Sequence, residues 1–83
     1  MNKFWWAHLS WWYDDFDGFG LTEQQAKKIV IQSWVENMKA KGHSLSEIDL
    51  GEIDEGSWAI QEIDLTKVIV GFHNYEWKIE DVI

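Results

Sequence analysis

The sequence predicts an α+β protein in which one long helix packs on one face of an antiparallel sheet of four to five strands. Two observations predict this fold class. Apolar residues recur at helical spacing over 22–42, and the flanking segments carry the alternating or continuous apolar runs of strands. Short turns between successive strands favour antiparallel pairing. The expected order is β-α-β-β-β, in a single domain over residues 1–83.

The first strand is expected over residues 4–13, which hold four of the seven tryptophans. Successive side chains of a strand point to opposite faces. One face would carry Trp5, Ala7, Leu9, Trp11 and Tyr13, and the other Phe4, Trp6, His8, Ser10 and Trp12. Both faces are largely apolar, which fits a strand covered on both sides or a strand with one face open to a partner. The face with His8 and Ser10 is expected to be the exposed one.

The helix is the next element, after a loop predicted over residues 14–20 from its Asp and Gly residues. Thr22 is the expected N-cap, and Gln25 completes a capping box by reaching back to the Thr22 amide. Gly42 is a suitable C′ residue. The apolar stripe comprises Ala26, Ile29, Val30 and Trp34, extended by Ile31, Val35 and Met38.

The remaining chain is expected to form strands. Residues 44–56 fit either a short helix that begins at a second capping box or a strand over 46–50, and we favour the strand. Three further apolar runs predict strands over 57–63, 68–72 and 75–79, with turns at 64–66 and 73–74. The helix can cover one face of this sheet, so some of the aromatic side chains are expected to remain outside the core.

Composition excludes several classes of function. Fifteen acids against seven lysines, with no arginine, give a net charge of −8, which disfavours nucleic-acid binding. The absence of cysteine excludes disulfides, thiolate-zinc sites and thiol catalysis. We find no signal-peptide pattern and no apolar run of about 20 residues. A soluble, cytoplasmic protein is expected.

No pattern of side chains predicts catalysis or metal binding. His8, His43 and His73 lack the spacing of a zinc pair. Residues 15–18 match part of a calcium loop but lack its further oxygen ligands, so we interpret them as a turn. The serines lie in no nucleophile motif. We therefore predict a protein that is not an enzyme and has no cofactor or metal.

Two features indicate a protein partner. The first is a lysine-free window over residues 42–66, whose acids fit either a docking patch for a basic surface or a solvated edge that prevents strand pairing. The second is the surplus of Trp and Tyr, residues enriched at interface hot spots. The expected partner-binding residues are Glu47, Asp49, Glu52, Asp54, Glu55, Trp6, Trp12, Tyr13 and Phe16.

The first strand, the 22–42 helix, the later strands and the acidic window together resemble the small acidic proteins that phages use against host defences, such as anti-CRISPR proteins. The resemblance covers the whole chain in outline and includes no shared motif, so it assigns no role to any residue. It implies a phage protein acting in the host cytoplasm, which inhibits a defence protein by covering a basic, nucleic-acid-binding surface, as a DNA mimic does.

The sequence therefore predicts a protein-binding module, monomeric or homodimeric, whose partner has a basic surface. Binding would be steric and electrostatic. The alternative is a structural or assembly protein that forms homo-oligomers through its aromatic sheet face.

Overall fold

The computed structural model describes residues 2–44, 46, 48 and 50–82, and for Glu55 the backbone alone. The predicted α+β class is confirmed, with antiparallel strands divided between a three-stranded sheet, in the order β2-β1-β3, and a two-stranded β4–β5 sheet. The elements are β1 (Lys3–Trp11), β2 (Asp14–Gly20), α1 (Glu23–Ala40), the 3-10 helix η2 (Leu50–Glu55), β3 (Ser57–Asp64), β4 (Val68–His73) and β5 (Glu76–Glu80).

The predicted loop over 14–20 is wrong, because these residues form β2. β1 ends at Trp11, and Trp12 and Tyr13 form a two-residue turn into β2. The strand exists because Asp and apolar or small residues alternate along it. Phe16 and Gly18 are buried on one side, and Asp15 and Asp17 are exposed on the other. That alternation outweighs the turn preference of Asp and Gly.

Helix α1 lies against β2 at its glycines. A Cβ atom built on Gly18 would lie 2.4 Å from the Ala26 carbonyl oxygen, and one on Gly20 would lie 2.6 Å from the Gln25 Cβ. Neither distance leaves room for a side chain. The glycines that indicated a loop therefore permit the close approach of the helix.

The predicted ends of the helix are confirmed, with one change in the cap. The Gln25 N–H donates to the Thr22 hydroxyl oxygen at 3.1 Å, as an N-cap requires. The Gln25 side-chain oxygen accepts from the Leu21 N–H at 2.9 Å, one residue before the expected Thr22 amide. Gly42 follows the helix with φ of 96°.

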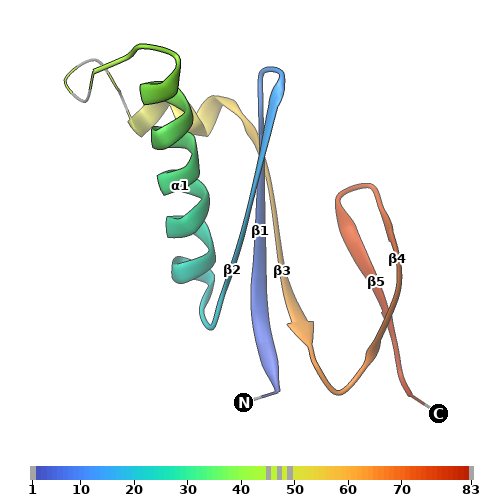
Figure 1. Ribbon diagram of the computed structural model, residues 1–83. Coiled ribbons are helices and arrows are strands. Elements are labelled where there is room, and N and C mark those ends of the chain that lie inside the picture. The colour runs from blue at the N-terminus through green and yellow to red at the C-terminus, as the bar shows by residue number, and fades with distance from the viewer. Residues whose placement is uncertain (1, 45, 47, 49, 83) are drawn as a thin grey trace.

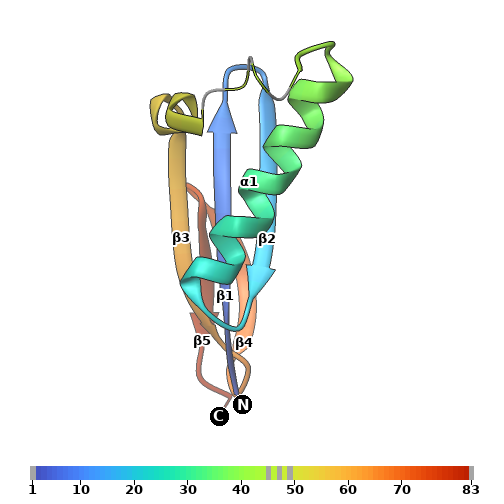
Figure 2. The ribbon, with the colours of Figure 1, turned by 90° about the vertical axis from the view of Figure 1, so that its left-hand side faces the viewer.

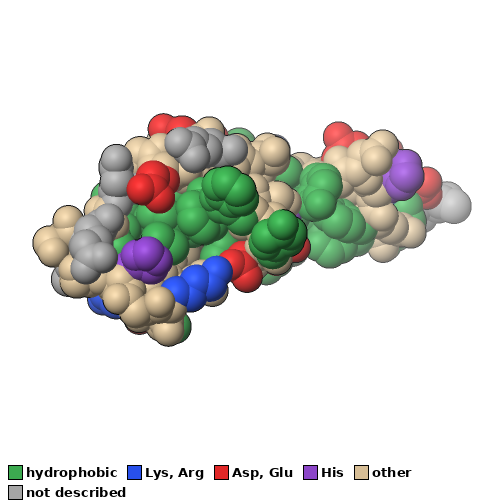
Figure 3. Space-filling view, turned by 90° about the horizontal axis from the view of Figure 1, so that it is seen from above, with side chains coloured by type: hydrophobic (Ala, Val, Ile, Leu, Met, Phe, Trp, Pro, Cys, Tyr) green, Lys and Arg blue, Asp and Glu red, His purple; other side chains and the backbone are tan. Residues whose placement is uncertain are grey.

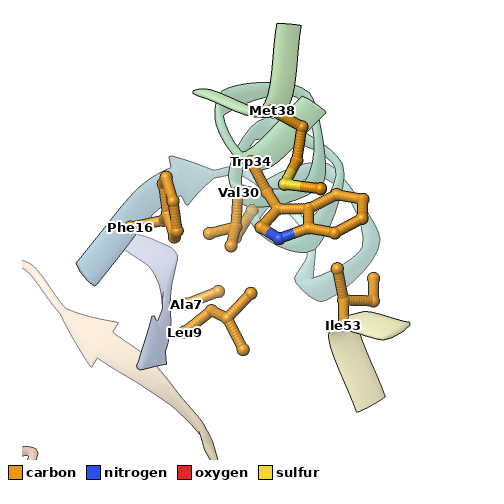
Figure 4. Close-up of a cluster of buried hydrophobic side chains, with 8 residues drawn as sticks. Ala7, Leu9, Phe16, Val30, Trp34, Met38 and Ile53 are labelled. Carbon is orange, nitrogen blue, oxygen red and sulfur yellow. The ribbon is translucent and has the colours of Figure 1, made fainter. Parts of the chain in front are cut away.

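The core lies between α1 and the three-stranded sheet (Figure 4). The odd-numbered face of β1 supplies Ala7 and Leu9, and β2 supplies Phe16. Phe16 is 8% exposed, so the expectation that it stands out as an anchor is wrong. The whole cluster comprises Ala7, Leu9, Phe16, Ala26, Val30, Trp34, Met38 and Ile53.

The β4–β5 hairpin forms a third layer, on the face of the sheet opposite α1 (Figures 1 and 2). It covers Trp6, whose ring packs edge-on against Phe72 and Trp77 with centroids 5.6 and 5.8 Å apart. The Gln61 side chain fixes the hairpin by accepting from the Trp77 N–H at 2.8 Å and donating to the Trp77 carbonyl at 2.9 Å. Trp6 is 2% exposed, so its predicted exposure is wrong, because the strands do not form one open sheet.

The predicted strand over 46–50 is not found. Leu50 begins η2, Ser46 and Ile48 lie outside any strand, and Glu47 and Asp49 are outside the described residues. Of the two alternatives, the structure shows the helical one, with 3-10 conformation at Ser46 and in η2. The helix η2 forms here because it places the Ile53 side chain in the core. The strands predicted near 57–63, 68–72 and 75–79 are confirmed as β3, β4 and β5.

Candidate functional site

The turn between β1 and β2 presents two aromatic side chains to solvent. Trp12 is 75% exposed and Tyr13 is fully exposed. Trp12 has a φ of 55°, a region that bulky residues rarely adopt. Such strain costs about 1–3 kcal/mol, and glycine would relieve it. We call Trp12 and Tyr13 the aromatic tip.

The aromatic tip is joined to η2 by Trp11. The Trp11 indole N–H donates to the Glu52 carbonyl at 3.1 Å. The Trp11 ring packs edge-on against the Trp12 ring and against buried Trp34, with centroids 6.0 and 5.6 Å apart. A hollow of about 510 Å³ lies beside the tip, lined by Ser10, Trp11, Trp12, Gly56 and Ser57. The tip and η2 thus form one end of the molecule.

Part of the predicted acidic patch lies at this end. Glu52 and Asp54 are on η2, with Asp54 exposed and Glu52 half-buried, and neither forms an ion pair with a described residue. Asp14, at the start of β2, is paired with Lys41. Figure 3, which looks down on this end, shows hydrophobic and acidic side chains exposed together.

The structure therefore brings together only some of the predicted partner-binding residues. Trp12, Tyr13, Glu52 and Asp54 share one end of the molecule. Glu55 contributes its backbone to η2, Glu47 and Asp49 lie outside the described residues, and Trp6 and Phe16 are buried on opposite faces of the sheet.

A polar cluster around the buried His8 side chain, which sequence analysis missed, lies on the β1–β2 face under the hairpin. His8 is 7% exposed. Its Nδ1 lies 2.7 Å from Asp17 Oδ1, and its Nε2 lies 3.1 Å from Ser10 Oγ and 3.2 Å from Asp15 Oδ1. The strand register explains the cluster, because His8 is opposite Asp17 and Ser10 is opposite Asp15. The alternating aspartates could have revealed it, had residues 14–20 been recognised as a strand.

The cluster has the hydroxyl–imidazole–carboxylate order of an acyl-transfer site, but its hydrogen bonds are arranged differently. Ser10 Oγ donates to Asp15 Oδ1 at 2.9 Å, so its proton is not directed at His8. The His8 ring also lies between the Trp6 ring, 5.6 Å away, and the Tyr75 ring, 5.1 Å away. The contacts satisfy a buried imidazole and hold the two strands in register.

Two carboxyl groups near the hairpin have lowered pKa values. Hydrogen bonds from the Thr66 hydroxyl and the Thr66 N–H lower the pKa of Asp64, at the turn from β3 to β4. A hydrogen bond from the Lys78 ammonium lowers the pKa of Glu76 on β5. Both carboxylates are thereby favoured in their charged form.

Comparison with protein-family models, with curated proteins and with solved structures finds no match to this chain. Within the described ranges, no three His, Asp or Glu side chains are grouped to hold a metal ion. No helix there combines the length and apolar character needed to cross a bilayer.

Proposed function

We propose that this protein binds a protein partner with a basic surface, and that the aromatic tip and η2 make the contact. The observation that carries the proposal is the aromatic tip itself. Two large rings stand in solvent on a turn where Trp12 holds a strained backbone angle. A hairpin without such a role would be more stable with glycine at this position. The strained backbone angle at Trp12 is explained if the exposed Trp12 and Tyr13 rings bind the partner.

Charge supports a basic partner. The chain has a net charge of −8. At the tip, Lys41 is paired with Asp14, which leaves Glu52 and Asp54 without a described cationic partner. Complementary charge speeds association and selects the partner, while buried aromatic rings supply most of the affinity. A nucleic-acid-binding surface on a defence protein is a target of this kind, and the acids would stand where phosphates bind.

The test uses a partner captured by the wild-type chain, purified, and titrated calorimetrically at low and high salt. Replacing both Trp12 and Tyr13 with alanine should weaken binding by about 1,000-fold, since two interface hot spots of about 2 kcal/mol each amount to about 4 kcal/mol. The double variant Glu52→Lys with Asp54→Lys should weaken binding by about tenfold and reduce its salt dependence.

The matched control is Glu80→Lys with Asp81→Lys, which changes the net charge equally at the opposite end of the molecule (Figure 1). It should leave affinity nearly unchanged. If both double lysine variants lost the same affinity, the acidic residues would act only through the net charge of the chain and not through a local contact at η2. If the variant with alanine at Trp12 and Tyr13 bound the partner with wild-type affinity, the aromatic tip would not be part of the contact.

A second candidate function is homo-oligomerisation, which the β4 strand favours. The hairpin makes the molecule elongated, with extents of 52 × 25 × 18 Å and a radius of gyration of 14.7 Å. A compact chain of this length would have a radius of gyration of about 12 Å. β4 pairs with β5 alone among the described strands, and its residues 68–73 are all exposed and include no Asp, Glu or Lys. In a chain of charge −8, this uncharged edge is the one best suited to pair with a second copy.

If β4 pairs with itself, sedimentation equilibrium of the wild-type chain should show a dimer whose affinity does not depend on salt. Val70→Lys should then give a monomer, because a lysine on an edge strand opposes further pairing. Gln32→Lys, on the exposed surface of α1, is the control and should remain dimeric. A wild-type monomer at high concentration would exclude this function.

A further inference from the structure

The face of the β4–β5 hairpin that is turned to the three-stranded sheet is apolar on both strands. Trp77 packs on Trp6 of the sheet, and Ile79 lies two residues further along β5, so both project from this inner face. The strand register pairs Phe72 with Trp77. It also pairs Ile69 with Ile79, and paired residues project from the same face. Each strand therefore contributes two apolar side chains to the inner face.

The sheet covers the β5 half of this inner face more fully than the β4 half. Trp77 and Ile79 are half-buried, and the Gln61 side chain of β3 binds the Trp77 backbone. On β4, Ile69 is 51% exposed and Phe72 is 47% exposed. Among the described strands, only β5 pairs with β4, so the other edge of β4 is open. Apolar side chains and an unpaired strand edge are thus exposed together.

A groove lies beside this part of β4, and β2 forms its opposite wall. Its volume is about 250 Å³, and it is lined by Trp6, His8, Asp17, Phe19, Phe72 and Trp77. Phe19 is on the face of β2 that is turned to the hairpin, because the strand register pairs it with Trp6. The Phe19 ring rests on Phe4, with centroids 5.6 Å apart, and is 52% exposed. A contiguous exposed apolar patch of this kind is typical of a protein interface.

Symmetry determines which side chains a second copy would bring to the groove. Two identical strands that pair antiparallel within one sheet are related by a two-fold axis perpendicular to that sheet. This axis keeps each face of the sheet on its own side. The β4 strand of a second copy would therefore lie about 4.8 Å from β4 with its own Ile69 and Phe72 turned inward. Those side chains would project toward the groove and toward Phe19.

We propose that β4 of a second copy closes this groove, so that Phe19 on β2 belongs to the dimer interface. The proposal rests on the pairing of β4 with itself described above, and it adds an apolar layer beneath the backbone hydrogen bonds of that pairing. The second copy fits the site because its β4 has no Asp, Glu or Lys and carries two apolar side chains on the required face.

Sedimentation equilibrium of two lysine variants tests the role of Phe19. Phe19→Lys should raise the dissociation constant of the dimer by at least about 30-fold, because each dimer loses two interface rings and gains two charges in an apolar layer. Leu21→Lys is the matched control. Leu21 is exposed to a similar degree but does not line the groove, so this variant should dimerise as the wild type does. Circular dichroism checks that both variants are folded.

Isotope-filtered NMR of the wild-type dimer tests the same contact without a substitution. Copies with ¹³C-labelled isoleucine methyl groups are mixed with unlabelled copies. Nuclear Overhauser effects are expected from the Ile69 methyl groups of one copy to the Phe19 ring of the other. A dimer that Val70→Lys dissociates, but that Phe19→Lys leaves intact and that lacks these effects, would retain β4 pairing and overturn the closure of the groove. A wild-type monomer would overturn both.

Discussion

Gly18→Ala is expected to lower the free energy of unfolding by about 3 kcal/mol, as overpacking at a rigid contact does. The new methyl group would lie 2.4 Å from the Ala26 carbonyl oxygen and 3.1 Å from two atoms of the Ile29 side chain. The first contact is with helix backbone, which cannot rotate away. The helix must move off β2, and the core between them must open. Urea denaturation followed by circular dichroism measures the change.

Gly71→Ala is the matched control. Apart from Gly71 and its two chain neighbours, no described residue has a heavy atom within 4 Å of a Cβ built at Gly71, and this glycine has no positive φ. The free energy of unfolding of the Gly71→Ala variant should stay within about 0.5 kcal/mol of that of the wild type. If the two alanine variants were equally stable, α1 would not approach β2 as closely as the structure shows.

Trp34→Ala is expected to lower the free energy of unfolding by about 3–5 kcal/mol. Trp34 is fully buried at the centre of the α1 face, and its ring packs edge-on against Trp11. A domain of this length has a total stability of about 4–12 kcal/mol, so the variant loses a large share of its free energy of unfolding. Thermal and urea denaturation should both show the loss.

Trp34→Phe separates ring packing from hydrogen bonding. Trp34 Nε1 is buried and has no hydrogen-bond partner among the described residues. Phenylalanine keeps most of the ring and removes an unsatisfied donor, so the loss of stability should be clearly smaller than for alanine. A loss as large as that of Trp34→Ala would mean that the indole N–H has a partner.

Local signals predicted much of the fold. The helix follows from its apolar period, from the Thr22 cap and from Gly42, and each of these acts over a few residues. The three later strands follow from their apolar runs in the same way. β2 was missed because Asp and Gly favour turns locally, whereas the strand is stabilised by pairing with β1 and by the helix on its glycines.

The candidate site shows the same division between local and long-range causes. The sequence named Trp12 and Tyr13, which are exposed, but placed them at the end of a strand instead of on a turn. Trp6 and Phe16 are aromatic as well but are buried, because the hairpin covers Trp6 and α1 covers Phe16.

By itself, the sequence determined the α+β class, the limits of the helix, the acidity and the surplus of rings, because these depend on residue type and short-range spacing. Only the tertiary structure decided which rings are buried, where the His8 cluster forms and which acids adjoin the aromatic tip. Burial and strand register arise from contacts between segments far apart in the chain. The packing of the β4–β5 hairpin against Trp6 is such a contact, and no local pattern encodes it.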